Sequence, residues 1–332
     1  WEYINKFSYE NINIRGYAMR KLLLGTTALA AAATLSANVA IADVSISGYY
    51  EWKYSSTASD ITANDGTTFT NDSEIVMTFS NKTDSGLTIG LVTEFETDDT
   101  DTAINESSMS ISGGFGKIVL GNNDGVGDNY GVSSTDLPAE EIYATGTDSL
   151  TILNADISGM SGDLNKIAYH LPAMGGLTAG VSFMNSGATG SADSTEVGAQ
   201  YSMSAGGAAI TIGAATATTE GSSQDTDSQV VGVKVASGNI TAAISQATFE
   251  EASTDEESTG ASVSFKVSDA MTFTVHTAET DDSTSSEEYT NTGVEVMYTI
   301  ASGLTAYLNV EDYDYKIGSG AGAGTTADSG TA

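Results

Sequence analysis

The chain has 332 residues, with 44 acidic side chains against 11 basic ones and a formal net charge of −33 at pH 7. This charge argues against a nucleic-acid-binding protein, because contact with a phosphate backbone requires a cationic face. The chain has no cysteine, which excludes a disulfide scaffold and thiol chemistry, and its apolar content of 40% is too high for a disordered acidic polymer.

The first two segments of the chain are not expected to belong to the mature protein. Residues 1–18 precede the first methionine and are mixed and polar, so we interpret them as an upstream extension outside the fold. Residues 19–42 have the parts of a secretory signal peptide: two basic residues, an apolar run over 22–33 and an Ala-Ile-Ala cleavage motif before Asp43. The run is shorter than the roughly 20 residues of a membrane-spanning helix, which argues against an uncleaved anchor. Cleavage leaves seven lysines, no arginine and 42 acidic residues, a formal charge of −35.

After residue 42, apolar and polar side chains alternate with a period of two, and no stretch shows helical spacing. In the first such segment, Val44, Ile46 and Trp52 lie on one face, and Glu51 and Lys53 lie on the other. We predict fifteen strands with this pattern, joined in turn by short turns and long polar links. They span about 44–55, 73–81, 86–97, 106–113, 116–121, 165–171, 177–185, 195–204, 208–218, 229–236, 239–249, 259–267, 270–279, 290–300 and 303–313.

This rhythm favours a transmembrane β-barrel over a soluble β-sandwich. A transmembrane strand needs about 9–11 residues, apolar outside and polar inside, and outer-membrane barrels have short periplasmic turns and long external loops. Every backbone group pairs with a neighbouring strand, so no long apolar run is required. Aromatic residues near strand ends, such as Trp52 and Phe249, are typical of the girdles at the membrane interfaces. A sandwich also alternates, but it has no need for short and long links in strict alternation.

The block "SMSISGGFGKIVLGNNDGVGDN" (108–129) consists of a strand, a tight turn and a strand that leads into a long loop. Together with segments 73–97 and 165–183, it resembles the Gram-negative general porins, and the resemblance extends over 19–313. The resemblance implies sixteen antiparallel strands around a water-filled lumen, a homotrimer in the outer membrane, and contacts with outer-membrane lipid and lipopolysaccharide. It also implies that the third loop, about 121–164, folds into the lumen as a constriction.

Two sets of charged residues are candidates for the pore. The constriction implied by the resemblance contains the loop acids Asp124, Asp128, Asp136, Glu140 and Glu141. Alternation places a second set on the lumen wall: Glu51, Lys53, Glu74, Glu94, Glu96, Glu295 and Glu311. General porins often face their loop acids with a cluster of arginine, whereas residues 43–332 contain no arginine. We therefore expect a pore that prefers cations.

The expected function is passive diffusion of small hydrophilic solutes and ions, and not catalysis. His170 and His276 are the only histidines, both on the lumen side by alternation, and no nucleophile elbow or zinc-protease motif accompanies them. No cofactor is required. Binding of Ca²⁺ or Mg²⁺ by loop acids stays open, although "DGVGDN" (124–129) lacks the full pattern of a calcium loop. The alternative is an acidic secreted surface-layer or adhesive β-protein, although no short solenoid repeat is present.

The strand count predicts an incomplete barrel. The last predicted strand, 303–313, ends at the external face, and the sequence after it reads as loop. Single-chain bacterial barrels have an even number of strands, and each unpaired edge group costs several kcal/mol in hydrocarbon. The predicted fold is therefore an all-β, transmembrane, antiparallel up-and-down barrel over 43–332, of the 16-stranded type, with its last strand missing from this chain. We expect roughly 10–15 further residues to supply that strand, and a gap one strand wide between 44–55 and 303–313.

Overall fold

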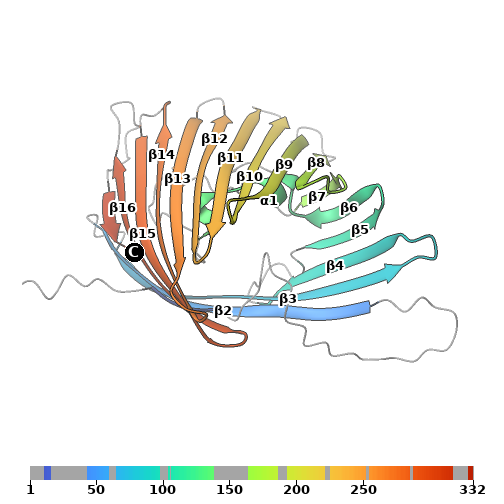
Figure 1. Ribbon diagram of the computed structural model, residues 1–332. Helices are drawn as coiled ribbons and strands as arrows, with labels where there is room; N and C mark the ends of the chain where they lie inside the picture. Colours follow the sequence, from blue (N-terminus) through green and yellow to red (C-terminus); the bar gives the residue numbers. More distant parts are fainter. Residues whose placement is uncertain are drawn as a thin grey trace, which may run out of the picture.

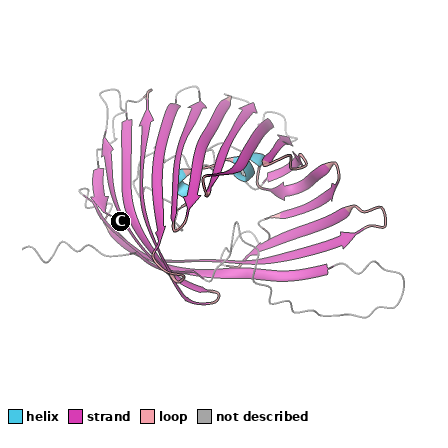
Figure 2. Ribbon diagram, viewed as in Figure 1, coloured by secondary structure: helices cyan, strands magenta, loops and turns pink. Residues whose placement is uncertain are grey.

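The computed structural model describes residues 11–15, 43–59, 65–97, 104, 106–137, 164–185, 193–220, 225–251, 254–284, 287–316 and 328–331. Strands make up most of these residues (Figure 2). The strands are β1 (Asn11–Arg15), β2 (Asp43–Ser59), β3 (Gly66–Lys82), β4 (Thr88–Glu96), β5 (Ser107–Gly113), β6 (Gly116–Asn123), β7 (Leu164–His170), β8 (Leu177–Asn185), β9 (Asp193–Ala205), β10 (Ala208–Glu220), β11 (Thr226–Ser237), β12 (Ile240–Glu251), β13 (Thr254–Lys266), β14 (Met271–Asp282), β15 (Glu287–Ala301), β16 (Leu304–Lys316) and β17 (Asp328–Thr331). Two short helical segments, α1 (Val126–Tyr130) and η2 (Ser134–Asp136), follow β6. None of the helices in the described part of the chain is long and apolar enough to cross a membrane.

Consecutive strands from β2 to β16 pair in antiparallel order, which is an up-and-down arrangement in one sheet. Figure 1 shows this sheet curving round on itself, with β2 and β3 across the opening from β10 and β11. Each of the fifteen predicted segments corresponds to one strand of the series β2–β16. The predicted antiparallel up-and-down β-barrel is therefore confirmed.

The two faces of the sheet differ as the alternation predicted. Large apolar side chains on the outward face are exposed, among them Ile46 at 59%, Ile167 at 56% and Ile244 at 57%. Inward neighbours such as Ala168 and Ala243 are buried. An apolar outer surface over so many strands would make a protein aggregate in water, whereas in a bilayer it contacts lipid tails.

The strands extend further into the long links than the sequence suggested. Because β12 ends at Glu251 and β13 begins at Thr254, the acids at 250, 251 and 255–257 lie in strands and not in an external link. Glu256 lies on the inward face and is only 8% exposed. Threonine and serine in these segments suit a pleated strand, and the hairpin register carries the pairing of β12 with β13 beyond the apolar band.

The first and last strands of the series, β2 and β16, are joined through short strands. β1 pairs with the middle of β2 and with the first half of β16, and β17 pairs near the carboxyl ends of both strands. This arrangement agrees with the expected gap one strand wide between 44–55 and 303–313. It differs from the expectation that residues 1–18 lie outside the fold. The physical reason is that two open strand edges pair with available extended sequence, and Asn11–Arg15 alternates apolar and polar residues. The expected signal peptide, 19–42, lies outside the described residues, and the missing strand stays a prediction.

Candidate functional site

A segment of the third loop, residues 124–137, lies inside the barrel and is called the loop segment below. Its helix α1 contacts β8, β9 and β10, and η2 contacts β12 and β13. Figure 1 shows α1 within the ring of strands, on the side away from β2 and β3. The rest of the third loop, 138–163, lies outside the described residues.

Glycines on the inward face make room for the loop segment. At Gly198, a Cβ would lie 2.9 Å from the carbonyl oxygen of Val126. At Gly213 and Gly232, a Cβ would collide with the backbone of Tyr130 and Val132, respectively. The glycines that approach the loop segment in this way form the glycine track, and they are Gly180, Gly198, Gly213, Gly232 and Gly260.

The register of the strands makes this track nearly continuous. Gly180 of β8 stands opposite Gly198 of β9, and Gly213 of β10 stands opposite Gly232 of β11. Ser245 of β12 then lies between Gly232 and Gly260 of β13. Only small residues allow the loop backbone to approach the sheet this closely.

Hydroxyl groups anchor η2 above the far end of the track. The backbone N–H of Ser134 donates to Ser245 Oγ at 2.9 Å, and Ser262 Oγ donates to the carbonyl oxygen of Ser134 at 2.5 Å. Asp136 lies 3.8 Å from the ammonium of Lys234, which points inward from β11. Backbone hydrogen bonds and the ion pair of Asp136 with Lys234 therefore help to hold the loop segment against the wall beneath it.

A buried carboxylate anchors the start of α1. Glu196 is 1% exposed and accepts hydrogen bonds from Ser182 Oγ at 2.8 Å and from the backbone N–H of Gly127 at 3.3 Å. Ser182 in turn accepts from the backbone N–H of Val126 at 3.2 Å. A carboxylate at the first N–H groups of a helix is favourable because these groups have no partner within the helix.

Tyr130 closes the other end of α1 against the wall. Its hydroxyl shares a hydrogen bond of 2.8 Å with Nδ1 of His170, and its ring packs in an apolar cluster with Val119, Val126 and Ala168. Burial raises the pKa of Tyr130, so its hydroxyl stays protonated. His170 faces the lumen side, as predicted, and its hydrogen bond to Tyr130 helps to fix the loop segment.

The structure places the predicted loop acids unequally. Asp124 is exposed, Asp128 is half-buried, and Asp136 is exposed with Lys234 near it. Glu140 and Glu141 lie outside the described residues.

The predicted wall residues all lie on the inward face. Glu51, Glu295 and Glu311 are buried, at 6%, 2% and 5% exposure. The half-buried members are Lys53, Glu74, Glu94 and Glu96. Together they occupy β2–β4, β15 and β16, and β2 and β3 lie across the lumen from the loop segment (Figure 1).

Most of the lysines lie either on the side of the lumen that carries the loop segment or at strand ends. Lys166 of β7 and Lys234 of β11 point inward on the side of the loop segment. Lys82, Lys117 and Lys266 lie at strand ends beside short turns. The wall that faces the loop segment is therefore rich in glutamate. Lys53, within β2, is a basic residue among these glutamates.

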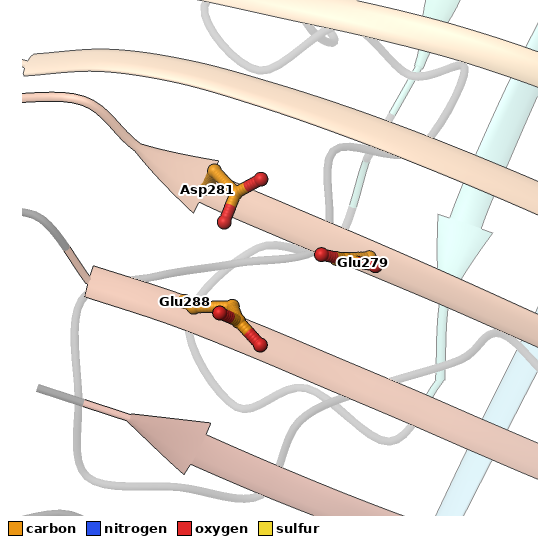
Figure 3. A group of neighbouring side chains, drawn as sticks. All are labelled: Glu279, Asp281 and Glu288. Atoms are coloured by element: carbon orange, nitrogen blue, oxygen red, sulfur yellow. The ribbon is translucent and has the colours of Figure 1, made fainter.

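A third group of acids lies on the outward face, near the ends of β14 and β15. Glu279, Asp281 and Glu288 each present one carboxylate oxygen within 4.8 Å of the others (Figure 3). Oxygen ligands of this kind suit Ca²⁺ or Mg²⁺. Exposed acids also gather without an ion, so binding of these cations stays a prediction.

Sequence reasoning missed the residues that seat the loop segment. These contacts depend on the register between strands, which decides which residues lie side by side at the same level of the barrel. They are the glycine track, the Ser182–Glu196 pair and the Tyr130–His170 contact. The only local signal was glycine at inward positions of successive strands. Phe249 was expected in an aromatic girdle. It instead faces inward and packs against Ala215, Val230 and Ala247, because it shares the parity of the buried residues of β12.

Comparison with known proteins places this architecture among outer-membrane channels. The sequence profile of the Gram-negative porin family matches residues 25–318. Comparison with curated protein sequences finds no match.

Solved structures with a similar fold are distant in sequence. An anion-selective porin from Comamonas acidovorans is 17% identical, with a TM-score of 0.58 over 87% of this chain and 98% of that one. The trimer form of OmpT, an outer membrane protein of Vibrio cholerae, is 14% identical, with a TM-score of 0.62 over 87% and 98%. A triple mutant of Rhodopseudomonas blastica porin is 15% identical, with a TM-score of 0.54 over 87% and 99%. At these identities the likeness establishes the fold alone.

Proposed function

The chain belongs to the Gram-negative porin family and is an outer-membrane channel protein, and from this premise we propose that it is a passive diffusion pore that prefers cations. Its solutes are small, hydrophilic molecules and ions. The channel does no chemistry on them. Family membership also removes the alternative of a secreted surface-layer or adhesive protein.

One observation carries the cation preference: the glutamates on the wall across from the loop segment. Glu74, Glu94 and Glu96 are half-buried on the inward face of β3 and β4. Fixed charges in a narrow lumen with a low-dielectric wall concentrate counter-ions, because the wall focuses their field. The anion-selective relative has the same fold, so the fold does not set the sign of selectivity, and the inward side chains must.

The test is the reversal potential of the pore in a planar bilayer under a tenfold KCl gradient. We expect a sign that reports K⁺ over Cl⁻ at low salt. The preference should weaken near 1 M salt, where the Debye length falls to about 3 Å. The double variant Glu74→Gln/Glu94→Gln should lower the permeability ratio, and the outward-facing Glu279→Gln should leave it unchanged. Anion preference of the unmodified pore at low salt would refute the proposal.

We also propose a homotrimer that is embedded in outer-membrane lipid and lipopolysaccharide. The support is the trimer form recorded for the Vibrio cholerae protein of similar fold. Gel mobility of unheated and heated samples in mild detergent measures the assembly. A single monomeric band before heating would contradict it.

A further inference from the structure

His276 lies in a polar cluster on the inward face of β14, β15 and β16. In register, His276 stands beside Gly293 of β15, and Gly293 stands beside Glu311 of β16. A Cβ at Gly293 would collide with the imidazole of His276. Because the glycine has no side chain, the imidazole and the carboxylate meet across it, with His276 Nε2 4.0 Å from Glu311 Oε1.

Two asparagines orient the carboxylate of Glu311. Asn291 Nδ2 donates to Oε2 at 3.0 Å, and Asn309 Nδ2 donates to Oε1 at 2.7 Å. Their own oxygens, Asn291 Oδ1 and Asn309 Oδ1, have no hydrogen-bond partner within the described part of the chain. Both ring nitrogens of His276 likewise have no hydrogen-bond partner in this part of the chain. All three residues are buried: Asn291 is 1% exposed, Asn309 is 4% exposed and His276 is 1% exposed.

All the unused atoms of this cluster except one imidazole N–H are electron-pair donors. A neutral imidazole offers one lone pair, and amide oxygens only accept hydrogen bonds. Buried acceptors without a partner are rare in folded proteins. A cation together with its bound water satisfies such a set, because the cation takes the imidazole and the carboxylate and the water donates to the amide oxygens.

We propose that this cluster binds one divalent transition-metal ion of the Zn²⁺, Ni²⁺ or Cu²⁺ type, with His276 and Glu311 as its protein ligands. Imidazole favours these ions over Ca²⁺ and Mg²⁺, which take oxygen ligands. With metal–ligand bonds of about 2.0–2.2 Å at a tetrahedral angle, one ion holds a nitrogen and an oxygen about 3.3–3.6 Å apart. The observed 4.0 Å between His276 Nε2 and Glu311 Oε1 lies about half an ångström above this range, so the imidazole and the carboxylate close by that amount when the ion binds. Asn291 and Asn309 act as positioning residues, because they hold the carboxylate toward the imidazole.

The bound ion changes the charge of the lumen wall. The site shares the inward face of β15 with Glu295, which is 2% exposed. Two added positive charges at this place offset the glutamates nearby, so the ion reduces cation preference. The binding test below does not use conductance, and its outcome is therefore independent of the proposed selectivity.

The test is to measure the binding of Ni²⁺ to the untagged full chain, folded in detergent, by isothermal titration calorimetry. Electron paramagnetic resonance with Cu²⁺ as the probe identifies the ligands. We expect one ion per chain and hyperfine coupling to one imidazole nitrogen. His276→Ala abolishes the coupling and lowers Ni²⁺ affinity at least tenfold. Glu311→Gln keeps the size of the side chain and lowers affinity by a comparable factor while the coupling remains.

Two matched variants control the experiment. His170→Ala removes the other inward histidine, whose Nδ1 is already hydrogen-bonded to Tyr130, and it should leave the affinity and the coupling unchanged. Glu288→Gln breaks up the outward acid trio and should also leave them unchanged. Heat-dependent gel mobility verifies the fold of each variant. Three results overturn the proposal: no binding by the unmodified chain, an affinity in His276→Ala or Glu311→Gln that equals that of the unmodified chain, or loss of the coupling in His170→Ala.

Discussion

Gly198 of the glycine track offers a direct way to loosen the loop segment without breaking the barrel. We predict that Gly198→Ala shifts the loop segment away from the wall. The new Cβ would stand 2.9 Å from Val126 O and 2.9 Å from Tyr130 Cβ, whereas ordinary contacts begin at 3.4 Å. The helix α1 must therefore retreat by roughly half an ångström, because optimal carbon contacts need about 3.5–4.0 Å. Strand pairing is unaffected, since alanine fits a strand.

The expected magnitude follows from what the retreat disturbs. Overpacking of this kind costs about 1–3 kcal/mol. The hydrogen bond from Val126 to Ser182 contributes about 0.5–1.5 kcal/mol, and the one from Gly127 to the Glu196 carboxylate contributes about 1.5–3 kcal/mol. The cost is therefore comparable with the contacts that hold α1. Each 1–2 kcal/mol lowers the ratio of docked to undocked loop by about 5- to 30-fold.

Single-channel recording in 1 M KCl measures the effect. We expect Gly198→Ala to show larger current noise and a higher mean conductance, because the loop segment leaves the lumen more often. Gly66→Ala is the matched control, since a Cβ at Gly66 meets nothing within 4 Å. If the two variants give the same conductance and noise as the unmodified pore, the glycine track does not seat the loop.

Three further predictions concern the charges and contacts around the loop segment. Tyr130→Phe removes the hydrogen bond to His170 and weakens docking by about 0.5–1.5 kcal/mol, which raises current noise; unchanged noise would count against that anchor. Lys234→Ala removes the ammonium 3.8 Å from Asp136 and should raise cation preference more at 0.1 M than at 1 M salt, because salt screens exposed charges; a lower preference contradicts this sign. Neutralising Asp124 and Asp128 together should lower the permeability ratio more than neutralising two exposed, outward-facing acids at 250 and 255, and equal effects would argue against a loop inside the lumen.

The sequence was sufficient for the strands because their pattern is local. A period of two and a rhythm of short and long links can be read within about ten residues, and β2–β16 follow it. The residues at which strands end beside the long links were harder to predict. Acids at 250–257 looked like loop, yet β12 and β13 continue through most of that stretch, because pairing along a hairpin does not stop where apolar residues stop.

The seat of the loop segment was not predictable, because it depends on register across strands. Gly213 and Gly232 meet only in one pairing of β10 with β11, and a slip by one residue would turn one of them outward. Glu196 meets Gly127 although 69 positions separate them in the chain. Alternation gives the face of a residue, but it gives neither its height in the barrel nor the loop that will cover it.

The alternation within a strand and the register between strands affect ion selectivity in different ways. Alternation alone put glutamates on the inward face of β2–β4, and the structure agrees. Register decides which charges face each other: Lys234 stands beneath Asp136 on the side of the loop segment, while Glu74 and Glu94 stand on strands across the lumen. The lysine therefore offsets charge of the loop segment and does not offset charge of the far wall. If the pore prefers cations as proposed, the wall glutamates contribute to that preference together with Asp124 and Asp128, and a change of its sign requires substitutions on the wall as well as in the loop segment.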